Sequence, residues 1–586
     1  MRRKRTIMTA ALMALAIMLI QAQEVKVPLR FDFYYSYEKV VEALKALNTA
    51  YPAMTRLDQV GKSEEGRIIW ALTINNPATG EPLSKPGVYV DGNIHGNEIQ
   101  AGEVCLYLAN RLLTNYGKLD DITKVVDRNV FYIIPVVNVD GRAHFFADAN
   151  TTSSNRGLRI SVDDDHDGLF DEDGPDDIDG DGNIMNMRIR DTLGKLRTDP
   201  ADSRLMITVK PGEKGEWTSL GQEGIDNDGD GQVNEDGEGY VDGNRNWGFS
   251  WNPSYVQRGA GDYPFEGIGI KAIAEWMLAR PNIIMVFAFH NSGGMYLRGP
   301  SFKAAGELPQ GDISVYNYLG ENIEKIVPGY EYLISWKDLY STYGDFTDFT
   351  NNLVGSYSLV GELYQVETET FDGTDRKKDQ ERSRFGEASE SERQRLLFND
   401  NVTQGELFHE WRPYKHPLYG EIEIGGWTKM STRLPPPFLL QELVHRNASS
   451  VIFAARYTPV VTMEVFEVRK IEGDLWSIRV RLMNEGAMPS VTYQTIRNKL
   501  YPRDILTIAG RDIKVVSGGE LKDPFTGLVD YKEYRPEVQM CQVPGFGKAE
   551  YQFLISGKGN VDLKFESRKA GTVTLTVPLK EKLKMK

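Results

Sequence analysis

The alternation of apolar and polar positions divides the chain into two parts. Up to about residue 458, short apolar runs alternate with stretches in which apolar side chains recur every three or four positions, a pattern typical of strands followed by helices. From about residue 460, apolar and β-branched residues alternate with polar ones between tight turns, which is typical of antiparallel strands. We therefore expect an α/β domain, with a mixed and mostly parallel sheet covered by helices on both faces, followed by an antiparallel β-sandwich.

This pattern also predicts the individual elements. Helices are expected at residues 36–47, 101–112, 267–278 and 438–455, and strands at residues 56–61, 68–74, 88–91, 128–137, 282–289 and 356–360. In the second part, hairpins are expected to pair residues 461–469 with 475–483 and residues 561–567 with 572–577, and no helix is predicted. Residues 372–395 are dense in charge without an apolar stripe, so they are expected to form an exposed helical or mobile insertion.

The N-terminal residues have the composition of a secretory signal. Basic residues at 2–5 precede an apolar run at 7–20, and small or polar residues follow at 21–23. The run is short for a membrane span, so we expect a signal peptide at 1–23, a main domain at 24–458 and a β domain at 459–586. The mature protein is then exported, periplasmic or secreted, without a membrane span. Cys105 and Cys541 are read as buried, unpaired thiols of different domains.

The net charge of −15 is concentrated in two short stretches. Residues 163–182 hold eleven carboxylates and residues 223–242 hold eight, and neither stretch contains a lysine or an arginine. The acidity is therefore local and calls for a local explanation, such as cation binding within the region 163–242. Nothing in the distribution of charge indicates binding to nucleic acid.

The acidic stretches repeat the frame Asp-x-Asp-x-Asp-Gly. The three copies contain Asp163, Asp165 and Asp167, then Asp177, Asp179 and Asp181, and finally Asp226, Asp228 and Asp230. Alternating carboxylates with a glycine at the sharp turn resemble the calcium loops of EF-hand and related repeats, although the glutamate at the twelfth loop position is missing. The frames predict calcium loops, and the alternative is a solvated acidic insert.

Candidate catalytic groups follow the predicted strands. His95 and Glu98 come just after the strand that begins at Val88, His290 ends the strand at 282–289, and Glu362 follows the strand at 356–360. Two imidazoles and a carboxylate are a ligand set for catalytic zinc, which keeps a further position open for water. Glu362 is then a candidate general base.

Together with the adjacent pair Asn244 and Arg245, which has the donors for gripping a carboxylate, these motifs resemble the zinc metallocarboxypeptidases of the carboxypeptidase A, B and T type between about Tyr37 and Val366. The resemblance implies zinc ligands at His95, Glu98 and His290, a general base at Glu362, a grip on the terminal carboxylate at Asn244 and Arg245, a mobile tyrosine at Tyr340, and an oxyanion-stabilising arginine at Arg188, with Arg190 as its rival. It also places Thr347 at the floor of the side-chain pocket, which predicts a broad or neutral preference and not strict selection of lysine or arginine.

The expected function is that of an exported, monomeric zinc carboxypeptidase that hydrolyses the C-terminal bond of peptides with a free terminal carboxylate. It is expected to act without removal of an inhibitory pro-segment. One alternative keeps the zinc site and directs it to cell-wall peptides with non-standard amide links. The other alternative is a catalytically dead, calcium-dependent binding protein on the same scaffold.

Overall fold

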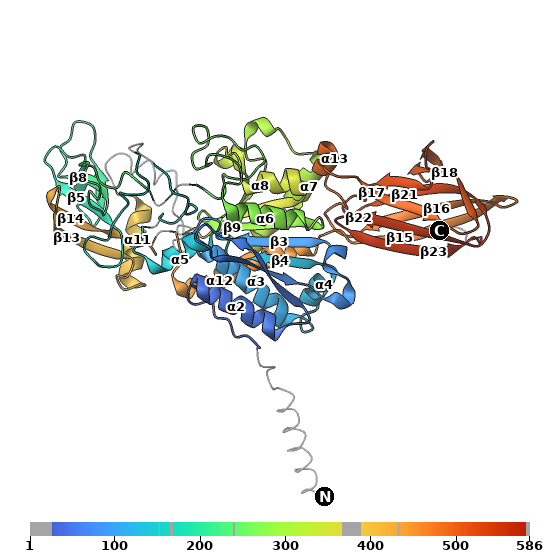
Figure 1. Cartoon of the computed structure of the whole chain (residues 1–586), viewed down its shortest axis with the longest axis horizontal. Helices are drawn as coiled ribbons and strands as arrows, with labels where there is room; N and C mark the ends of the chain where they lie inside the picture. The colour runs from blue at the N-terminus through green and yellow to red at the C-terminus, as the bar shows by residue number, and fades with distance from the viewer. Residues whose placement is uncertain are drawn as a thin grey trace, which may run out of the picture.

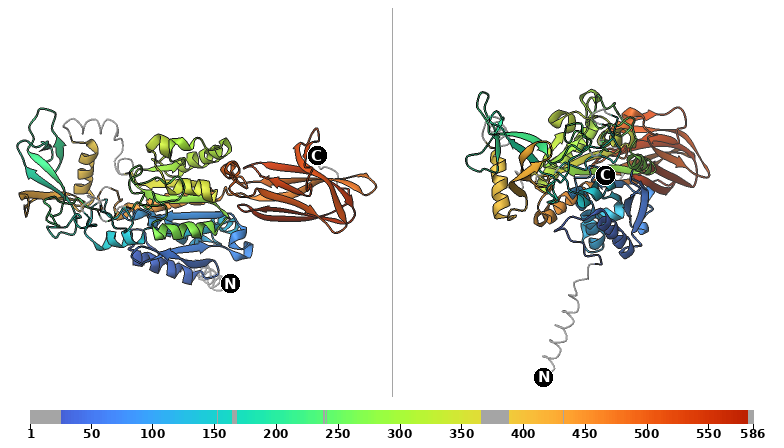
Figure 2. Two further views of the ribbon diagram at one scale, coloured as in Figure 1. Left: turned by 45° about the horizontal axis from the view of Figure 1, so that its top comes forward. Right: turned by 60° about the vertical axis from the view of Figure 1, so that its left-hand side comes forward.

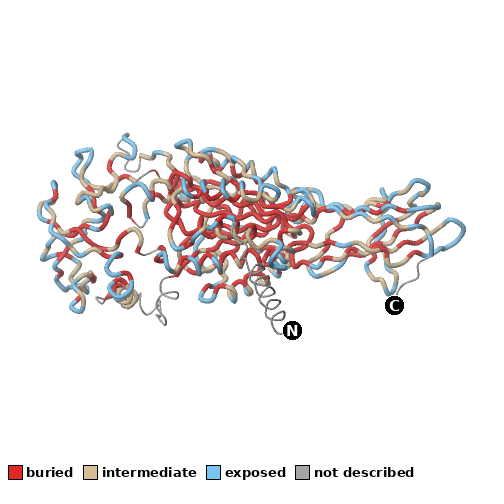
Figure 3. The backbone as a smooth tube through the Cα atoms, turned by 90° about the horizontal axis from the view of Figure 1, so that it is seen from below, coloured by how far each residue is buried: buried red, intermediate tan, exposed pale blue. Residues whose placement is uncertain are grey.

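The computed structural model describes residues 26–581 except residues 152, 164–167, 238, 240, 366–387 and 432. The predicted signal peptide and most of the segment 372–395 lie outside the described residues. Three bodies follow one another along the long axis of the molecule: a small sheet built from inserted segments, a central α/β domain and a C-terminal β domain (Figure 1). Buried residues gather most densely in the central domain (Figure 3).

The central domain is built on an eight-stranded mixed sheet. Its strands are β1 (Thr55–Lys62), β2 (Ile68–Ile74), β3 (Gly87–Gly92), β4 (Val130–Ile134), β9 (Ile283–Asn291), β10 (Met295–Arg298), β11 (Glu331–Ile334) and β12 (Tyr357–Leu363). They are arranged in the order β1-β2-β4-β3-β9-β12-β10-β11. The central pairs β4–β3, β3–β9 and β9–β12 are parallel, and antiparallel pairs lie toward the edges. This confirms the predicted fold class.

Helices flank this sheet on both faces (Figures 1 and 2). They are α2 (Tyr37–Ala50), α3 (Gln100–Asn115), α4 (Asp120–Arg128), α5 (Val139–Ala147), α6 (Ile268–Leu278), α7 (Gln310–Ile326), α8 (Phe346–Phe349) and α12 (Pro437–Ala455). Helix α12 packs against α3 and α7, while α6 packs against β1. Every residue of β9 is buried, which explains why its sequence is an apolar run without alternation.

A second, six-stranded sheet combines two segments that are far apart in the sequence. Its strands are β5 (Asn186–Arg190), β6 (Leu196–Thr198), β7 (Met206–Thr208), β8 (Trp217–Gln222), β13 (Phe408–His416) and β14 (Gly420–Trp427), and α11 (Glu390–Asn401) accompanies them. The hairpin β13–β14 joins through antiparallel pairing of β14 with β5. The sequence pattern predicted neither the hairpin nor its union with the acidic region.

The C-terminal domain consists of two antiparallel sheets around one apolar core. Its elements are β15 (Val461–Glu472), β16 (Leu475–Asn484), α13 (Tyr493–Asn498), β17 (Asp504–Ala509), β18 (Ile513–Asp523), β19 (Leu528–Tyr531), β20 (Val538–Cys541), β21 (Lys548–Gly557), β22 (Asn560–Ser567) and β23 (Gly571–Pro578). Both predicted hairpins are present, as β15–β16 and β22–β23. The short helix α13 was not expected, and it lies where this domain meets the central one.

Two further features bear on the sequence predictions. Cys105 and Cys541 are both buried and unpaired. Within the described part of the chain, no helix is both long and apolar enough to cross a membrane.

Candidate active site

Three neighbouring parallel strands bring the predicted catalytic groups to one edge of the central sheet. β3, β9 and β12 lie side by side, and their carboxyl ends point the same way. His95 and Glu98 lie in the turn between β3 and α3, whereas His290 and Glu362 face each other as register partners on β9 and β12. The carboxyl ends of parallel strands are where α/β sheets usually hold their ligands.

His95, Glu98 and His290 form a buried triangle of potential metal ligands. The Nδ1 atom of His95 lies 3.0 Å from Oε1 of Glu98, Nδ1 of His290 lies 3.1 Å from Oε2 of Glu98, and the two Nδ1 atoms are 3.2 Å apart. Ligands about 2.0–2.1 Å from a tetrahedral zinc ion are separated by roughly 3.3 Å, so the triangle fits zinc.

Neighbouring groups orient two of these ligands. Asp242 Oδ1 lies 3.0 Å from Nε2 of His95, which places the ring proton on Nε2 and leaves the Nδ1 lone pair for a metal. The backbone N–H of Asn291 donates to Oε2 of Glu98 over 3.1 Å. Burial alone would raise the pKa of Asp242, but His95, Arg156 and Arg245 hold that pKa well below its usual value.

The turn that carries His95 is held by tight backbone contacts. Asn93 has a left-handed backbone with φ of 60°, and its side-chain amide donates to the carbonyls of His95 and Gly96. A Cβ atom at Gly96 would lie 2.3 Å from the carbonyl oxygen of Asn155, so only glycine fits there. The buried Arg142 donates to Asn93 Oδ1 over 2.8 Å and braces the turn from behind.

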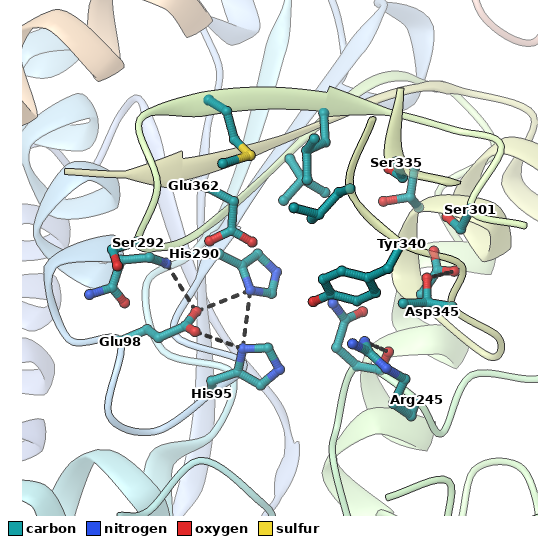
Figure 4. A pocket seen from close by; sticks show the side chains of 18 of the residues that line it. His95, Glu98, Arg245, His290, Ser292, Ser301, Ser335, Tyr340, Asp345 and Glu362 are labelled. Carbon is teal, nitrogen blue, oxygen red and sulfur yellow. Dashed lines mark hydrogen bonds and ion pairs between the residues drawn. The ribbon is translucent and has the colours of Figure 1, made fainter. Parts of the chain in front are cut away.

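The predicted substrate-binding residues surround a pocket of about 200 Å³ next to this triangle. Asn244, Arg245, Tyr340 and Thr347 all line it, and Figure 4 shows the ring of Tyr340 directed into the pocket between the histidines and Arg245. Asn244 is fixed because its side-chain oxygen accepts the N–H of Phe346 over 3.0 Å. Tyr340 is 54% exposed, whereas Arg245 and Thr347 are buried.

The pocket also has an apolar wall and a polar corner. Met295, Leu297, Leu339 and Val360 line it together with the hydroxyl groups of Ser301 and Ser335. Asp345 lies beside Arg245 in the same corner (Figure 4), and its carboxylate caps α8 by accepting the N–H of Asp348 over 3.0 Å.

Glu362 lies in the pocket beside the metal-ligand triangle (Figure 4). Burial raises the pKa of Glu362 to about 7, with His290 opposing the rise and Glu98 adding to it. A carboxylate with a pKa near neutrality is suited to accepting a proton and releasing it again in one catalytic cycle.

Arg188 does not reach this pocket, and the structure corrects its predicted place. It lies on β5 of the six-stranded sheet, where its guanidinium stands 4.0 Å from the ring centre of Trp217 and 4.1 Å from that of Trp411. Its Nη2 pairs with Glu423 over 2.6 Å. The rival, Arg190, lies on the same strand, 4.6 Å from the ring centre of Trp217.

Two other arginines line the pocket instead, and neither was predicted from the sequence. Arg156 lies 3.4 Å from Glu98 and 3.1 Å from Asp242, and Arg433 lies 3.2 Å from Glu98. Arg156 lies seven residues before the first acidic frame, with Arg159 between them, so nothing local in the sequence distinguished it as a pocket residue. Arg433 belongs to the segment before α12 and had no local signal.

Among the described residues, the acidic frames combine with carboxylates from outside the frames. Their carboxylates gather in mixed groups: Asp173 with Asp226 and Asp228, Asp177 and Asp179 with Glu223, and Asp228 and Asp230 with Glu235. Asp181 is engaged by His409 and Arg412 at 2.7 and 2.8 Å. Asp163 accepts the N–H of Gly168, and Asp165 and Asp167 lie outside the described residues.

Comparison with known proteins adds an independent finding. Residues 40–173, which include His95 and Glu98, match the family model described as zinc carboxypeptidase, and residues 460–578 match one described as a domain of unknown function. Carboxypeptidase D of Homo sapiens is 41% identical over 110 residues, which cover 19% of this chain and 8% of that protein. Carboxypeptidase B of Astacus astacus is 32% identical over 115 residues, which cover 20% of this chain and 36% of that protein.

The similarity therefore spans well under two thirds of the length of these relatives. Among solved structures, thrombin activatable fibrinolysis inhibitor (TAFI) is similar with a TM-score of 0.43 and 15% sequence identity, covering 74% of this chain and 78% of that one.

Proposed function

We propose that the chain is a zinc-dependent carboxypeptidase, which removes residues from the C-terminus of peptides; the match of residues 40–173 to the zinc carboxypeptidase model supports this. The observation that carries this proposal is the shared pocket. The triangle of His95, Glu98 and His290 opens into the same cavity as the Asn244–Arg245 pair.

The catalytic steps follow from the groups that line the pocket. His95, Glu98 and His290 would hold a zinc ion, and the chemistry that such an ion would supply is that of a Lewis acid, which lowers the pKa of water toward neutrality. The Glu362 carboxylate accepts a proton from the attacking water and passes it to the nitrogen of the leaving residue. Its position opposite His290, beside the metal-ligand triangle, supports this role.

Restriction to the C-terminus is proposed to come from Asn244 and Arg245. Both are fixed by hydrogen bonds to neighbouring backbone, so they present a preorganised fork for a terminal carboxylate. The pocket beyond them is lined mainly by apolar side chains and hydroxyls, with Thr347 among them. Asp345 is occupied as a helix cap. We therefore expect neutral C-terminal residues to be preferred over lysine and arginine.

Stabilisation of the oxyanion is assigned to Arg156 in place of Arg188. Arg156 lines the pocket beside Glu98 and Asp242, which hold its guanidinium at the metal end of the cavity. A donor at this position acts on charge that develops only in the transition state.

Two further parts of the proposal concern the cations of the inserted region and the location of the protein. The mixed carboxylate groups around Asp173, Asp177 and Glu223 are proposed to bind calcium, a hard cation that prefers such oxygen ligands. The basic and apolar residues at 2–20 support export of the protein.

The proposal is tested by removing and restoring the metal. Protein stripped with a chelator is expected to lose hydrolysis of a neutral peptide and to regain it as one zinc ion binds per chain. Glu362→Gln is the matched control, because it is expected to bind the same amount of zinc without turnover. Full activity in metal-free protein, or in Glu362→Gln, would refute the proposed chemistry.

A further inference from the structure

Arg433 lies on the opposite side of the metal-ligand triangle from Arg245. Its Nη2 donates to Glu98 Oε1 over 3.2 Å and to the backbone carbonyl of Asn291. In Figure 4, Glu98 and the adjoining Ser292 lie on one side of the two histidines and Arg245 lies on the other. We therefore expect a peptide whose terminal carboxylate is held by Arg245 to extend its amino-terminal side past the metal-ligand triangle toward Asn291 and Arg433.

The surroundings of Arg433 hold its backbone in place before any ligand binds. The carbonyl of Arg433 accepts the side-chain amide of Asn291 over 2.7 Å and that of Gln100 over 3.4 Å. The next residue, Leu434, is buried, and three prolines at 435–437 stiffen the approach to α12. Arg433 is thus preorganised, unlike a long side chain on an open surface.

Charge distinguishes Arg433 from the other two arginines of the pocket. Arg156 pairs with Asp242 as well as with Glu98, and Arg245 lies beside Asp345 (Figure 4). Among the described residues, the ion pair of Arg433 is with Glu98. If Glu98 is engaged by a bound metal ion, Arg433 would keep no close ion pair among the described residues, while its charge still acts on Glu362 across the pocket.

Arg433 also has unused capacity for hydrogen bonding. Its side chain remains 27% exposed, so a ligand can reach the guanidinium. Its hydrogen bonds to Glu98 and Asn291 both use Nη2, and its Nε is buried, so within the described part of the protein Nη1 is the nitrogen left to meet a ligand. An arginine fork that is only partly satisfied favours a planar anion, and a carboxylate is the anion that peptides carry.

We propose that Arg433 is a specificity-determining residue that binds a second carboxylate, located on one of the two residues amino-terminal to the scissile bond. This inference rests on the proposed carboxypeptidase activity and narrows its substrates to acidic peptides. Arg245 would hold the terminal carboxylate, and Arg433 would hold the side chain of a glutamate or aspartate on the other side of the metal centre.

A purely structural role is the competing explanation. If Arg433 only orients Glu98, its loss should weaken metal binding and should slow all peptides alike. If Arg433 selects substrates, its loss should change the ratio between acidic and neutral peptides while the zinc content stays the same.

The experiment uses peptides that differ only in glutamate or glutamine, placed either immediately before the scissile bond or one residue earlier. For the zinc-loaded full chain, kcat/KM is expected to favour glutamate over glutamine at least about tenfold at one of the two positions, as a charge-assisted hydrogen bond would provide. In Arg433→Gln the ratio is expected to fall close to one at unchanged zinc content. Arg446→Gln, the same substitution on the exposed surface of α12, is expected to keep the wild-type ratio.

A wild-type ratio near one would overturn the inference, as would loss of zinc in Arg433→Gln or an equal slowing of both peptides. Calorimetry on zinc-loaded Glu362→Gln provides a readout that does not depend on turnover. Tighter binding of the glutamate peptide there, lost on adding Arg433→Gln, supports the role of Arg433 even if no peptide is hydrolysed. Absence of hydrolysis by the wild type would count against the proposed function alone.

Discussion

At the scale of single residues, the ionisation of Glu362 sets how activity depends on pH. Burial raises the pKa of Glu362 from 4.5 to about 7, and a bound metal ion would act in the opposite direction. Glu362 must be ionised to accept a proton, so activity is lost as pH falls through its pKa in the folded protein. We expect the acid limb of kcat/KM between 4.5 and about 7, measured as a pH profile on the zinc-loaded protein. Undiminished activity below pH 4.5 would contradict this.

The assignment of the oxyanion-stabilising role to Arg156, and not to Arg188, gives a second prediction about single residues. Arg156→Gln is expected to lower kcat by about 10²–10³-fold, because it removes an oxyanion donor. Arg188→Gln is the matched control, and it should alter stability more than turnover, because its guanidinium packs between two tryptophans remote from the pocket. Steady-state kinetics and thermal unfolding of both variants provide the measurement. A larger loss of kcat in Arg188→Gln than in Arg156→Gln would indicate instead that Arg188 acts in the active site.

The site residues that could be predicted are those positioned by segments that neighbour them in the sequence. His95, Glu98, His290 and Glu362 directly follow or end buried strands, so their place at the sheet edge could be predicted from the apolar runs before them. Arg433 reaches the pocket only because α12 packs against α3, a contact between segments more than 300 residues apart in sequence. The sequence around position 433 contains no pattern that would predict the contact between α12 and α3.

At the scale of elements, the fold was predictable where strands are continuously apolar. β9 is buried along its whole length and was found from its composition. The hairpin β13–β14 was missed because its strands mix charged and aromatic side chains and are stabilised by pairing with β5, over 200 residues earlier. Arg188 was misplaced for a related reason: the acidic insertion separates β5 from the central domain, so a match drawn across it selects the wrong arginine.

The acidic loops lead to the prediction at this scale. Burial, together with Asp179 and Asp177, raises the pKa of Glu223 to about 7, so these carboxylates repel one another without a cation. Calcium is expected to raise the melting temperature, with a stabilisation of about 2.7 kcal/mol at a free concentration one hundred times Kd. The effect should weaken below pH 7, where Glu223 takes up a proton.

Thermal unfolding of chelator-treated, zinc-reconstituted protein during a calcium titration checks this prediction. Glu223→Gln is the variant in which the calcium effect should shrink, and Asp191→Asn, outside the carboxylate groups, is the control. A melting temperature that does not respond to millimolar calcium would leave the acidic stretches as solvated inserts.

At the scale of the whole molecule, the C-terminal domain is joined to the strands that carry the active site. The buried Lys569 donates to the carbonyl of Ile283, at the start of β9, and to that of Val354, just before β12, over 2.8 Å in the second case. Asp312 of α7 accepts two backbone N–H groups of α13 and the hydroxyl of Tyr357 on β12. The domain thus supports β9 and β12 at the ends opposite to His290 and Glu362.

Lys569 makes the stability of this contact between the two domains depend on pH. Burial, with a smaller contribution from Arg568, lowers the pKa of Lys569 to about 7, below its value of 10.5 in the unfolded chain. Between these values the unfolded chain binds more protons, so the contribution of Lys569 to stability rises with pH from about 7 to 10.5. Wild-type stability minus that of Lys569→Met should therefore increase over this range, as measured by denaturant unfolding at pH 7 and 9. If the difference in unfolding free energy between the wild type and Lys569→Met were the same at pH 7 and pH 9, the ammonium group would not be desolvated at the interface.

Zinc chemistry and a carboxylate grip are proposed to act in one pocket on the C-terminus of a peptide. The most direct test is mass spectrometry of two otherwise identical peptides, one with a free C-terminal carboxylate and one with a C-terminal amide, after incubation with the zinc-loaded protein. We expect stepwise loss of C-terminal residues from the free peptide and little or no cleavage of the amide, because Asn244 and Arg245 are proposed to bind the terminal carboxylate. Equal cleavage of both peptides, or cleavage at internal bonds, would contradict it.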